Sequence, residues 1–269
     1  YDVIVDGRLN NPPIFTSTPL LMWRAGAPYR VGVGGGNNDL VYNVRVKAYD
    51  RSTHYIRGSR ALTAPFGVDA SAIDWRPEIF LTEDERECAD AVWQRAAERV
   101  AGSAAETIRL LVNLSASEQK RRWADENFVT VLKAVRAAHP TIPIVVMGLP
   151  SESESVSAVA HAVGAEAAST PALRDALALV AASDRVLTPD TSISHAASAF
   201  NKPVVVLLRR DCDPYAPWDV PGELVFWDGE TVHGLRTETV LPAVLRLLSP
   251  GGEKRDMSHD ARALQPLTT

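Results

Sequence analysis

The second half of the chain alternates short apolar runs with amphipathic segments, and this alternation most constrains the fold. The apolar runs are rich in β-branched residues, as expected of strands buried on both faces of a sheet. The segments between them place apolar residues three to four positions apart, as a helix packed on a sheet does. Repeated strand–helix units of this kind predict an α/β fold with a parallel, doubly wound sheet and right-handed crossovers. Strands are predicted at residues 108–114, 142–147, 186–187, 204–208 and 223–227, and helices at 123–138, 152–163, 172–182, 194–200 and 237–248.

The first part of the chain carries fewer such units. Strands are predicted at residues 1–6 and 29–33, and helices at 14–25, 54–66 and 83–100. The last of these helices begins at Thr82, with Glu85 three residues on, which is the pattern of a capping box. We place a domain boundary after this helix. The predicted organisation is a partial N-terminal Rossmann-like domain in residues 1–103, a C-terminal Rossmann-like domain in 104–248, and a Gly-, Pro- and charge-rich tail in 249–269 expected to be disordered.

Composition excludes several classes of function. The 269 residues suffice for one large or two ordinary domains, and a formal net charge of -5 argues against broad nucleic-acid binding, which needs a basic face. The two cysteines, Cys88 and Cys212, provide neither a disulfide framework nor metal-ligand spacing, and fit a reducing compartment. No apolar run approaches the roughly 20 residues of a membrane span.

Polar side chains follow the predicted strand that ends at Leu187. In an open α/β sheet, ligands bind beyond the carboxyl ends of the strands and against helix N-termini. Asp190, Thr191, Ser192 and His195 occupy this place, just before and within the start of a predicted helix. They could hold a polar, phosphate-bearing ligand. Alternatively, Asp190 or Thr191 is an ordinary N-cap and His195 an ordinary helix histidine.

Two further loops end at the same predicted edge of the sheet, in residues 113–123 and 148–152. Lysine and arginine make charge-assisted contacts to phosphate oxygens, and a carboxylate commonly binds the vicinal hydroxyls of a ribose. The basic run could also be a solvated charge cluster, but its position directly after a strand favours a functional role. The candidate residues are Ser115, Ser117, Lys120 and Arg121 in the first loop and Glu152 in the second.

These loops resemble those of glycosyltransferase family nine, the ADP-heptose:lipopolysaccharide heptosyltransferases. Residues 190–195 resemble the family's Asp-Thr-Gly-x-x-His signature, and residues 148–152 match its Gly-x-x-x-Glu turn. Residues 1–6 and 30–32 resemble the middle of its N-terminal domain. The family's phosphate loop is matched by Ser115, by Lys120 or Arg121, and by Trp123.

Two departures from the family pattern concern the donor loops. Ser192 stands where the family commonly has glycine, so the backbone approach to a pyrophosphate differs. One extra residue precedes Trp123, and therefore either Lys120 or Arg121 could take the role of the family's phosphate-binding lysine.

The resemblance implies a GT-B fold, with two Rossmann-like domains facing a cleft and an incomplete N-terminal one here. It implies inverting transfer of a heptose from ADP-heptose to a sugar hydroxyl of a lipopolysaccharide core or similar glycan, without a metal or other cofactor. Glu152 would hold the nucleotide ribose. The other donor-binding residues would be Ser115, Ser117, Lys120, Arg121, Asp190, Thr191, Ser192 and His195.

The general base and the partners also follow from the resemblance. The family's base is an aspartate in its first loop, which is expected upstream of Tyr1; within this chain, Asp6 is the only carboxylate at a strand end in the first segment. The implied partners are a nucleotide sugar and a glycan or lipid-linked sugar acceptor, in the cytoplasm or at the inner face of the bacterial inner membrane. The alternatives are a family member with another nucleotide sugar or acceptor, and an inactive nucleotide-binding or scaffold protein.

Overall fold

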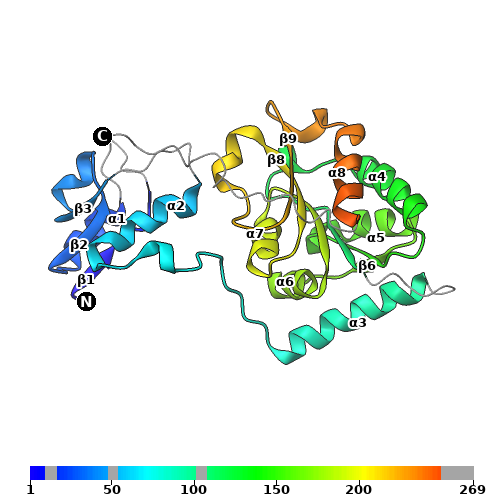
Figure 1. Cartoon of the computed structure of the whole chain (residues 1–269), viewed down its shortest axis with the longest axis horizontal. Coiled ribbons are helices and arrows are strands. Elements are labelled where there is room, and N and C mark those ends of the chain that lie inside the picture. The colour runs from blue at the N-terminus through cyan, green and yellow to red at the C-terminus, as the bar shows by residue number, and fades with distance from the viewer. Residues whose placement is uncertain (10–16, 48–53, 101–107, 250–269) are drawn as a thin grey trace. The chain divides into compact units, whose positions relative to one another are not determined.

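The structure is a computed structural model that describes residues 1–9, 17–47, 54–100 and 108–249. The chain forms two compact units, Tyr1–Trp75 and Arg76–Thr269, each with its own parallel sheet (Figure 1). Within the described residues, no helix combines the length and the apolar character needed to cross a membrane.

The smaller unit is built on a three-stranded parallel sheet in the order β1-β2-β3. Val31 and Val33 of β2 pack with Leu62. Gly32, between them, leaves room for the ring of Tyr42, which forms a second cluster with Met22. Strand β3 was not predicted, because its three residues include an exposed arginine and are too few to show a period. The elements are β1 (Val3–Val5), α1 (Ser17–Arg24), β2 (Tyr29–Val33), β3 (Val44–Val46) and α2 (Tyr55–Arg60), which continues as a 3₁₀ helix over Ala61–Phe66.

The larger unit has a six-stranded sheet in the order β6-β5-β4-β7-β8-β9, with every neighbouring pair parallel. This confirms the doubly wound sheet predicted from the alternation. The order reverses at β4 and β7, and a ligand crevice opens at such a reversal in folds of this type. The strands are β4 (Leu110–Asn113), β5 (Ile144–Met147), β6 (Glu166–Ala168), β7 (Arg185–Pro189), β8 (Val204–Arg209) and β9 (Gly222–Trp227).

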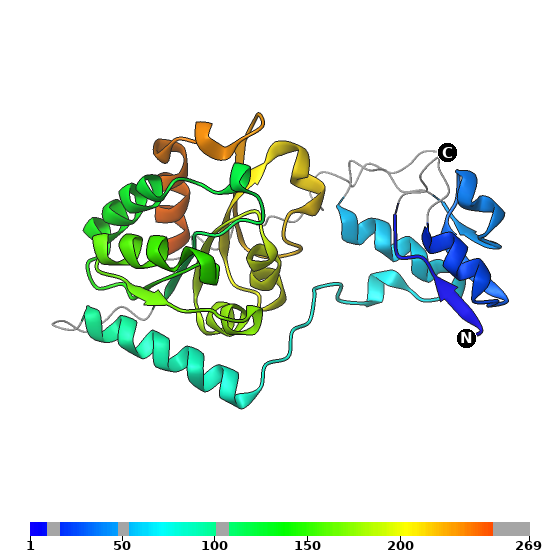
Figure 2. The same cartoon turned by 180° about the vertical axis from the view of Figure 1, so that it is seen from behind.

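Helices cover both faces of this sheet (Figure 2). Helices α4, α5 and α8 bury their apolar stripes on one face, and α3, α6 and α7 bury theirs on the other. The edge strand β6 was not predicted, since its sequence Glu-Ala-Ala has little strand propensity. The helices are α3 (Glu83–Arg99), α4 (Asp125–Ala138), α5 (Ser153–Ala162), α6 (Leu173–Ala182), α7 (Ser192–Ala199) and α8 (Thr237–Leu248).

Helix α3 belongs to the larger unit. It starts at the predicted capping box, in which the Thr82 amide donates to Glu85 Oε2 at 2.8 Å and the Glu85 amide donates to Thr82 Oγ1 at 3.3 Å. Its Trp93 is buried in the same cluster as α6. The compact units therefore divide after Trp75, whereas the sequence analysis placed the boundary after residue 103.

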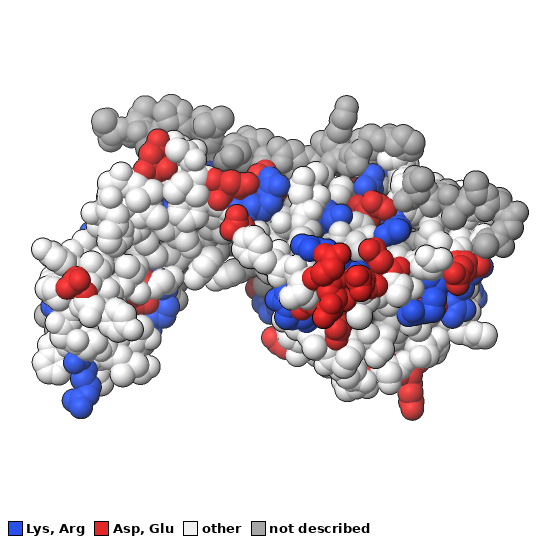
Figure 3. Space-filling model, turned by 90° about the horizontal axis from the view of Figure 1, so that it is seen from below, with Lys and Arg blue, Asp and Glu red and all other residues white. Residues whose placement is uncertain are grey.

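The outer surface carries acidic and basic side chains next to one another on the face seen in Figure 3. One such contact joins Glu85 of α3 to Arg174 of α6. Helix α8 ends at Leu248, as predicted, and the predicted disordered tail lies, from residue 250 on, outside the described residues.

Candidate functional site

A cavity of about 420 Å³ lies at the carboxyl edge of the larger sheet, beside the β4–β7 reversal. Its wall is largely apolar, with Met147 at the end of β5, Leu173 at the start of α6 and Ile193 at the start of α7. Polar groups from the loops after β4 and β7 complete it, and they include Ser115 and Thr191. An apolar slot with a few polar groups at its rim is typical of a site for a small organic ligand.

Asn113 connects the two central strands at this edge. Its side chain is buried, and its Nδ2 donates to Thr188 Oγ1 at 3.0 Å and to the carbonyl of Ser115 at 3.1 Å. Its Oδ1 accepts from the Ser115 amide at 3.2 Å. The sequence analysis did not single out Asn113. The available signal was a lone polar residue in the otherwise apolar run from Leu110 to Leu114.

The structure brings Ser115 and Glu152 into direct contact, although they come from different loops. The Ser115 hydroxyl donates to Glu152 Oε2 and accepts from the Leu149 amide at 2.6 Å. Arg122 Nε donates to the other carboxylate oxygen of Glu152 at 2.9 Å. Arg122 thus orients Glu152, the candidate residue for binding the ribose. This role of Arg122 was not predicted from the sequence, although the neighbouring cations Lys120 and Arg121 were.

Gly148 is required for this arrangement. A Cβ at this position would lie 2.8 Å from Val156 Cγ2, 3.0 Å from Ser115 Oγ and 3.3 Å from Glu152 Oε2. The first of these distances is shorter than ordinary van der Waals contact. The glycine of the Gly-x-x-x-Glu turn therefore lets the serine and the glutamate approach each other.

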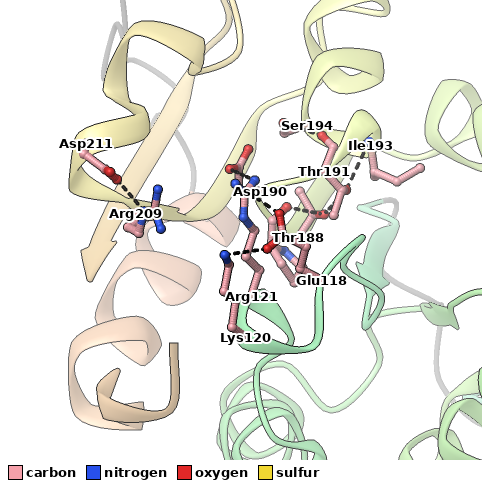
Figure 4. Close-up of polar contacts among 11 residues, drawn as sticks. Glu118, Lys120, Arg121, Thr188, Asp190, Thr191, Ile193, Ser194, Arg209 and Asp211 are labelled. Atoms are coloured by element: carbon pink, nitrogen blue, oxygen red, sulfur yellow. Dashed lines mark hydrogen bonds and ion pairs between the residues drawn. The ribbon is translucent and has the colours of Figure 1, made fainter. Parts of the chain in front are cut away.

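The two candidate cations of the basic loop take different positions (Figure 4). Arg121 is mostly buried, and its Nη1 donates to Asp190 Oδ2 at 3.1 Å across the β4–β7 reversal. Its buried Nε has no hydrogen-bond partner within the part of the chain that the structure describes. Lys120 is more exposed and pairs with Glu118 at 2.7 Å.

Asp190 and His195 perturb each other. Burial raises the pKa of the Asp190 carboxyl, and the positive charges of Arg121, His195 and Arg209 partly oppose that rise. Desolvation lowers the pKa of the His195 imidazole, while the charge of Asp190 opposes this. The His195 side chain is nevertheless exposed on α7. The pair places one negative group and one titratable ring at the start of α7.

Thr191 is the N-cap of α7, since its Oγ1 accepts from the Ile193 amide at 3.2 Å. The alternative that Thr191 is an ordinary N-cap is thereby confirmed. Asp190 is not the N-cap and pairs with Arg121. Ser192 is the first helical residue, is exposed, and lines the cavity together with Thr191. Ser117 is also exposed on the cavity wall.

Asp6 lies in the smaller unit and is engaged on both carboxylate oxygens. Tyr42 Oη donates to Oδ2 at 2.6 Å, and Arg8 Nε donates to Oδ1 at 3.0 Å. Burial alone would raise the pKa of Asp6, but the hydrogen bonds from Arg8 and Tyr42 outweigh it and the pKa is lowered. A carboxylate with a lowered pKa is a weak general base.

Comparisons with known proteins agree with the loop pattern. The family described as glycosyltransferase family 9 (heptosyltransferase) matches residues 6–217. No curated protein matches the sequence. Among solved structures, a family 9 glycosyltransferase from Veillonella parvula is 16% identical with a TM-score of 0.71, and the match covers 91% of this chain and 73% of that one.

Two Escherichia coli structures are also similar. Heptosyltransferase WaaC with ADP-2-deoxy-2-fluoro heptose is 16% identical, with a TM-score of 0.62 over 91% of this chain and 72% of that one. ADP-heptose lipopolysaccharide heptosyltransferase II is 17% identical, with a TM-score of 0.58 over 92% and 76%. These likenesses show a shared fold, and the two α/β units with parallel sheets are GT-B-like, as predicted.

Proposed function

The chain belongs to glycosyltransferase family 9 (heptosyltransferase), and on that premise we propose that it transfers a heptose from ADP-heptose to a sugar hydroxyl of a lipopolysaccharide core or similar glycan. The proposed reaction inverts the anomeric carbon and uses no metal ion. The observation that carries the proposal is a cavity lined by Ser115, which pairs with Glu152, and by Thr191 and Ser192, which directly follow Asp190 and its partner contact with Arg121.

The donor nucleoside is proposed to occupy the apolar cavity. Met147, Leu173 and Ile193 offer apolar surface against which a nucleobase can pack. A cavity of about 420 Å³ is large enough to hold a nucleobase. Glu152 is proposed to accept hydrogen bonds from the ribose hydroxyls, with Arg122 holding its carboxylate in place.

The pyrophosphate is proposed to lie between the basic loop and the start of α7. Lys120 and Arg121 provide charge, and the first turn of α7 at Ser192 provides the positive end of a helix dipole. Ser192 replaces a glycine of the family pattern, so its hydroxyl becomes a further donor there. Asp190 keeps Arg121 oriented toward this region, since the two side chains are paired.

The chemical step breaks the bond between the anomeric carbon and the phosphate oxygen and forms a bond to the acceptor oxygen. ADP leaves with the bonding electrons, and the developing negative charge is stabilised by Lys120, Arg121 and the start of α7. The acceptor hydroxyl gives its proton to a base. The engagement of both oxygens of Asp6 by Arg8 and Tyr42 disfavours Asp6 for this step.

The acceptor is proposed to be a glycan or lipid-linked sugar at the inner face of the bacterial inner membrane. Family membership supports this part of the proposal. The donor and the acceptor are tested together by incubating the protein with ADP-heptose and a lipopolysaccharide core acceptor, and measuring ADP release and glycan mass. If nucleotide is released only when a different nucleotide sugar is supplied, that nucleotide sugar is the donor. Binding of ADP-heptose without any transfer would favour a nucleotide-binding scaffold.

The site assignment predicts that Arg121→Ala weakens ADP binding but leaves adenosine binding unchanged. Arg121 would contact only the phosphates, and a charge-assisted hydrogen bond contributes about 1.5–3 kcal/mol, so about a tenfold or larger loss is expected. Calorimetric titration with ADP and with adenosine measures both. Arg246→Ala is the matched control, because Arg246 is paired with Glu223 on α8 and β9, away from the cavity. Equal losses for ADP and adenosine in Arg121→Ala would refute the phosphate assignment.

A further inference from the structure

Arg209 ends strand β8 beside the segment that carries Asp190. Strands β7 and β8 are neighbours, and the Asp190 amide donates to the Leu207 carbonyl at 3.1 Å. The carboxyl end of β8 therefore brings Arg209 to the same edge of the sheet. Figure 4 shows Arg209 alongside the contact between Asp190 and Arg121. Its Nε donates to Asp211, two residues further on.

Three cations and three acids meet at this edge and form what we call the ion-pair cluster. Each cation has an acid partner: Lys120 pairs with Glu118, Arg121 with Asp190 and, at 3.7 Å, also with Glu118, and Arg209 with Asp211. The formal charges cancel. A diphosphate that enters must therefore take over cations that carboxylates already hold. The cluster consists of Glu118, Lys120, Arg121, Asp190, Arg209 and Asp211.

Arg209 and Arg121 both act electrostatically on Glu118 and on Asp190. The pKa of Glu118 is lowered, first by the hydrogen bond from Lys120 and then, against a desolvation cost, by the charges of Lys120, Arg121 and Arg209. The charge of Arg209 also opposes the raised pKa of Asp190. The geometric basis is the pairing of β8 with β7, which places Arg209, at the end of β8, on the same sheet edge as the loop that carries Asp190.

Exposure separates the acids that can leave from the one that cannot. The side chains of Glu118 and Asp211 are 45% and 66% exposed, so each can turn into water at little cost. The side chain of Asp190 is only 12% exposed and pairs with Arg121 at 3.1 Å. A ligand can thus release Lys120 and Arg209 from their acids while the contact between Arg121 and Asp190 remains.

We propose that Arg209 is a third cation for the donor diphosphate, acting with Lys120 and Arg121, and that Glu118 and Asp211 hold the cations until the diphosphate replaces their carboxylates. This inference rests on the proposed function of the site. It extends the donor site from the loops after β4 and β7 to the end of β8. The guanidinium is well suited to the role because it can make two parallel hydrogen bonds to a phosphate.

The chain provides a matched control in the next residue. Arg210 has the same charge, but its guanidinium pairs with Asp228 at 2.9 Å and lies 4.8 Å from the ring centroid of Phe226. Removal of Arg210 changes the net charge by the same amount as removal of Arg209. A difference between the two variants therefore reports the position of Arg209 and not the total charge.

The test is calorimetric titration of ADP, AMP and inorganic pyrophosphate into the full chain and its variants. Arg209→Ala is expected to weaken binding of ADP and pyrophosphate by about 10- to 100-fold and binding of AMP by less. Arg210→Ala should bind all three as the unchanged protein does. Asp211→Asn should bind ADP as tightly or more tightly, because it removes the competing carboxylate. If the Arg209–Asp211 pair only held the loop in shape, Asp211→Asn would weaken ADP as Arg209→Ala does.

The outcomes separate this inference from the proposed function. If the unchanged protein binds ADP and Arg209→Ala binds it equally well, the role of Arg209 is refuted and the proposed function stands. If the unchanged protein binds pyrophosphate through Arg209 but does not bind ADP, the anion site stands and the proposed donor is refuted. If it binds neither ligand, both are refuted.

Discussion

At the scale of single residues, two aspartates that follow strands differ in chemistry because their partners differ. Asp6 follows β1 and accepts hydrogen bonds from Arg8 and Tyr42, and these lower its pKa although it is buried. Asp190 follows β7, and burial raises its pKa because the charges of Arg121, His195 and Arg209 oppose that rise only in part. The first is a structural ion pair. The second keeps a destabilised charge beside a cavity, which is the pattern of a functional site.

Asp6→Asn is therefore expected to destabilise the smaller unit by about 2–3 kcal/mol at pH 7, because it removes one partner of a buried, charge-assisted contact. Folding lowers the pKa of Asp6, so its carboxylate contributes fully to the free energy of unfolding at pH values above its unfolded-state pKa of about 3.9. This contribution is lost as the pH falls through the folded-state pKa. Denaturant unfolding at pH 7 and at pH 3 should show the difference between the two proteins shrinking at low pH. Asp2→Asn, an exposed aspartate at the start of the same strand, is the control. A constant difference between pH 7 and pH 3 would contradict this account.

At the scale of elements, α3 shows how a mostly polar helix is fixed to a domain. Its buried stripe contains only Ala89, Trp93 and Ala96. Ion pairs secure both ends, with Glu85 joined to Arg174 of α6 near the start, and Arg95 and Arg99 joined to Glu166 of β6 near the end. Burial would raise the pKa of Glu166, but the two arginines outweigh it and the pKa is lowered. Trp93 is the largest side chain of this stripe and is fully buried.

Trp93→Ala is expected to lower the free energy of unfolding of the larger unit by about 3–5 kcal/mol, since it leaves a cavity where a fully buried indole packs. Glu87→Ala, at an exposed position of the same helix, should change it by less than about 0.5 kcal/mol. Chemical denaturation followed by circular dichroism measures both. Similar costs for the two variants would mean that α3 does not depend on its apolar stripe.

At the scale of the whole molecule, the described residues divide their cores between the two units. The clusters around Val31 and around Tyr42 lie in the smaller unit, and the two clusters on the faces of the larger sheet lie in the larger unit. No cluster among the described residues draws buried members from both. The described residues of each unit thus contain a core of their own.

Scanning calorimetry of the full chain is expected to show two transitions, of which ADP raises only the one that belongs to the larger unit. At a free ADP concentration of 100 times its dissociation constant, the stabilisation is about 2.7 kcal/mol. Asp6→Asn should lower the midpoint temperature of only the transition that belongs to the smaller unit. The two changes together assign each transition to its unit. A single transition that shifts with both changes would show that the units unfold together.

Elements whose pattern is local could be predicted from the amino-acid sequence. The alternation of apolar runs and amphipathic segments predicted the parallel sheet of the larger unit, because burial on one face or two imposes a period on neighbouring residues. Thr82 and Glu85 predicted the start of α3, since a capping box closes within three residues. Strands β3 and β6 escaped prediction because Arg45 interrupts the first and the sequence Glu-Ala-Ala of the second has little strand propensity, whereas the equally short β1 is Val-Ile-Val.

Which polar groups contact each other depends on the three-dimensional fold. Arg121 and Asp190 are 69 residues apart, and no local pattern distinguishes Arg121 from Lys120 as the partner of Asp190. The roles of Asn113 and Arg122 likewise depend on contacts between loops, and α3 joined the larger unit through Trp93 and not through its place in the chain. The strength of an ion pair or a hydrogen bond depends on distance in space and on desolvation, and the fold alone sets both.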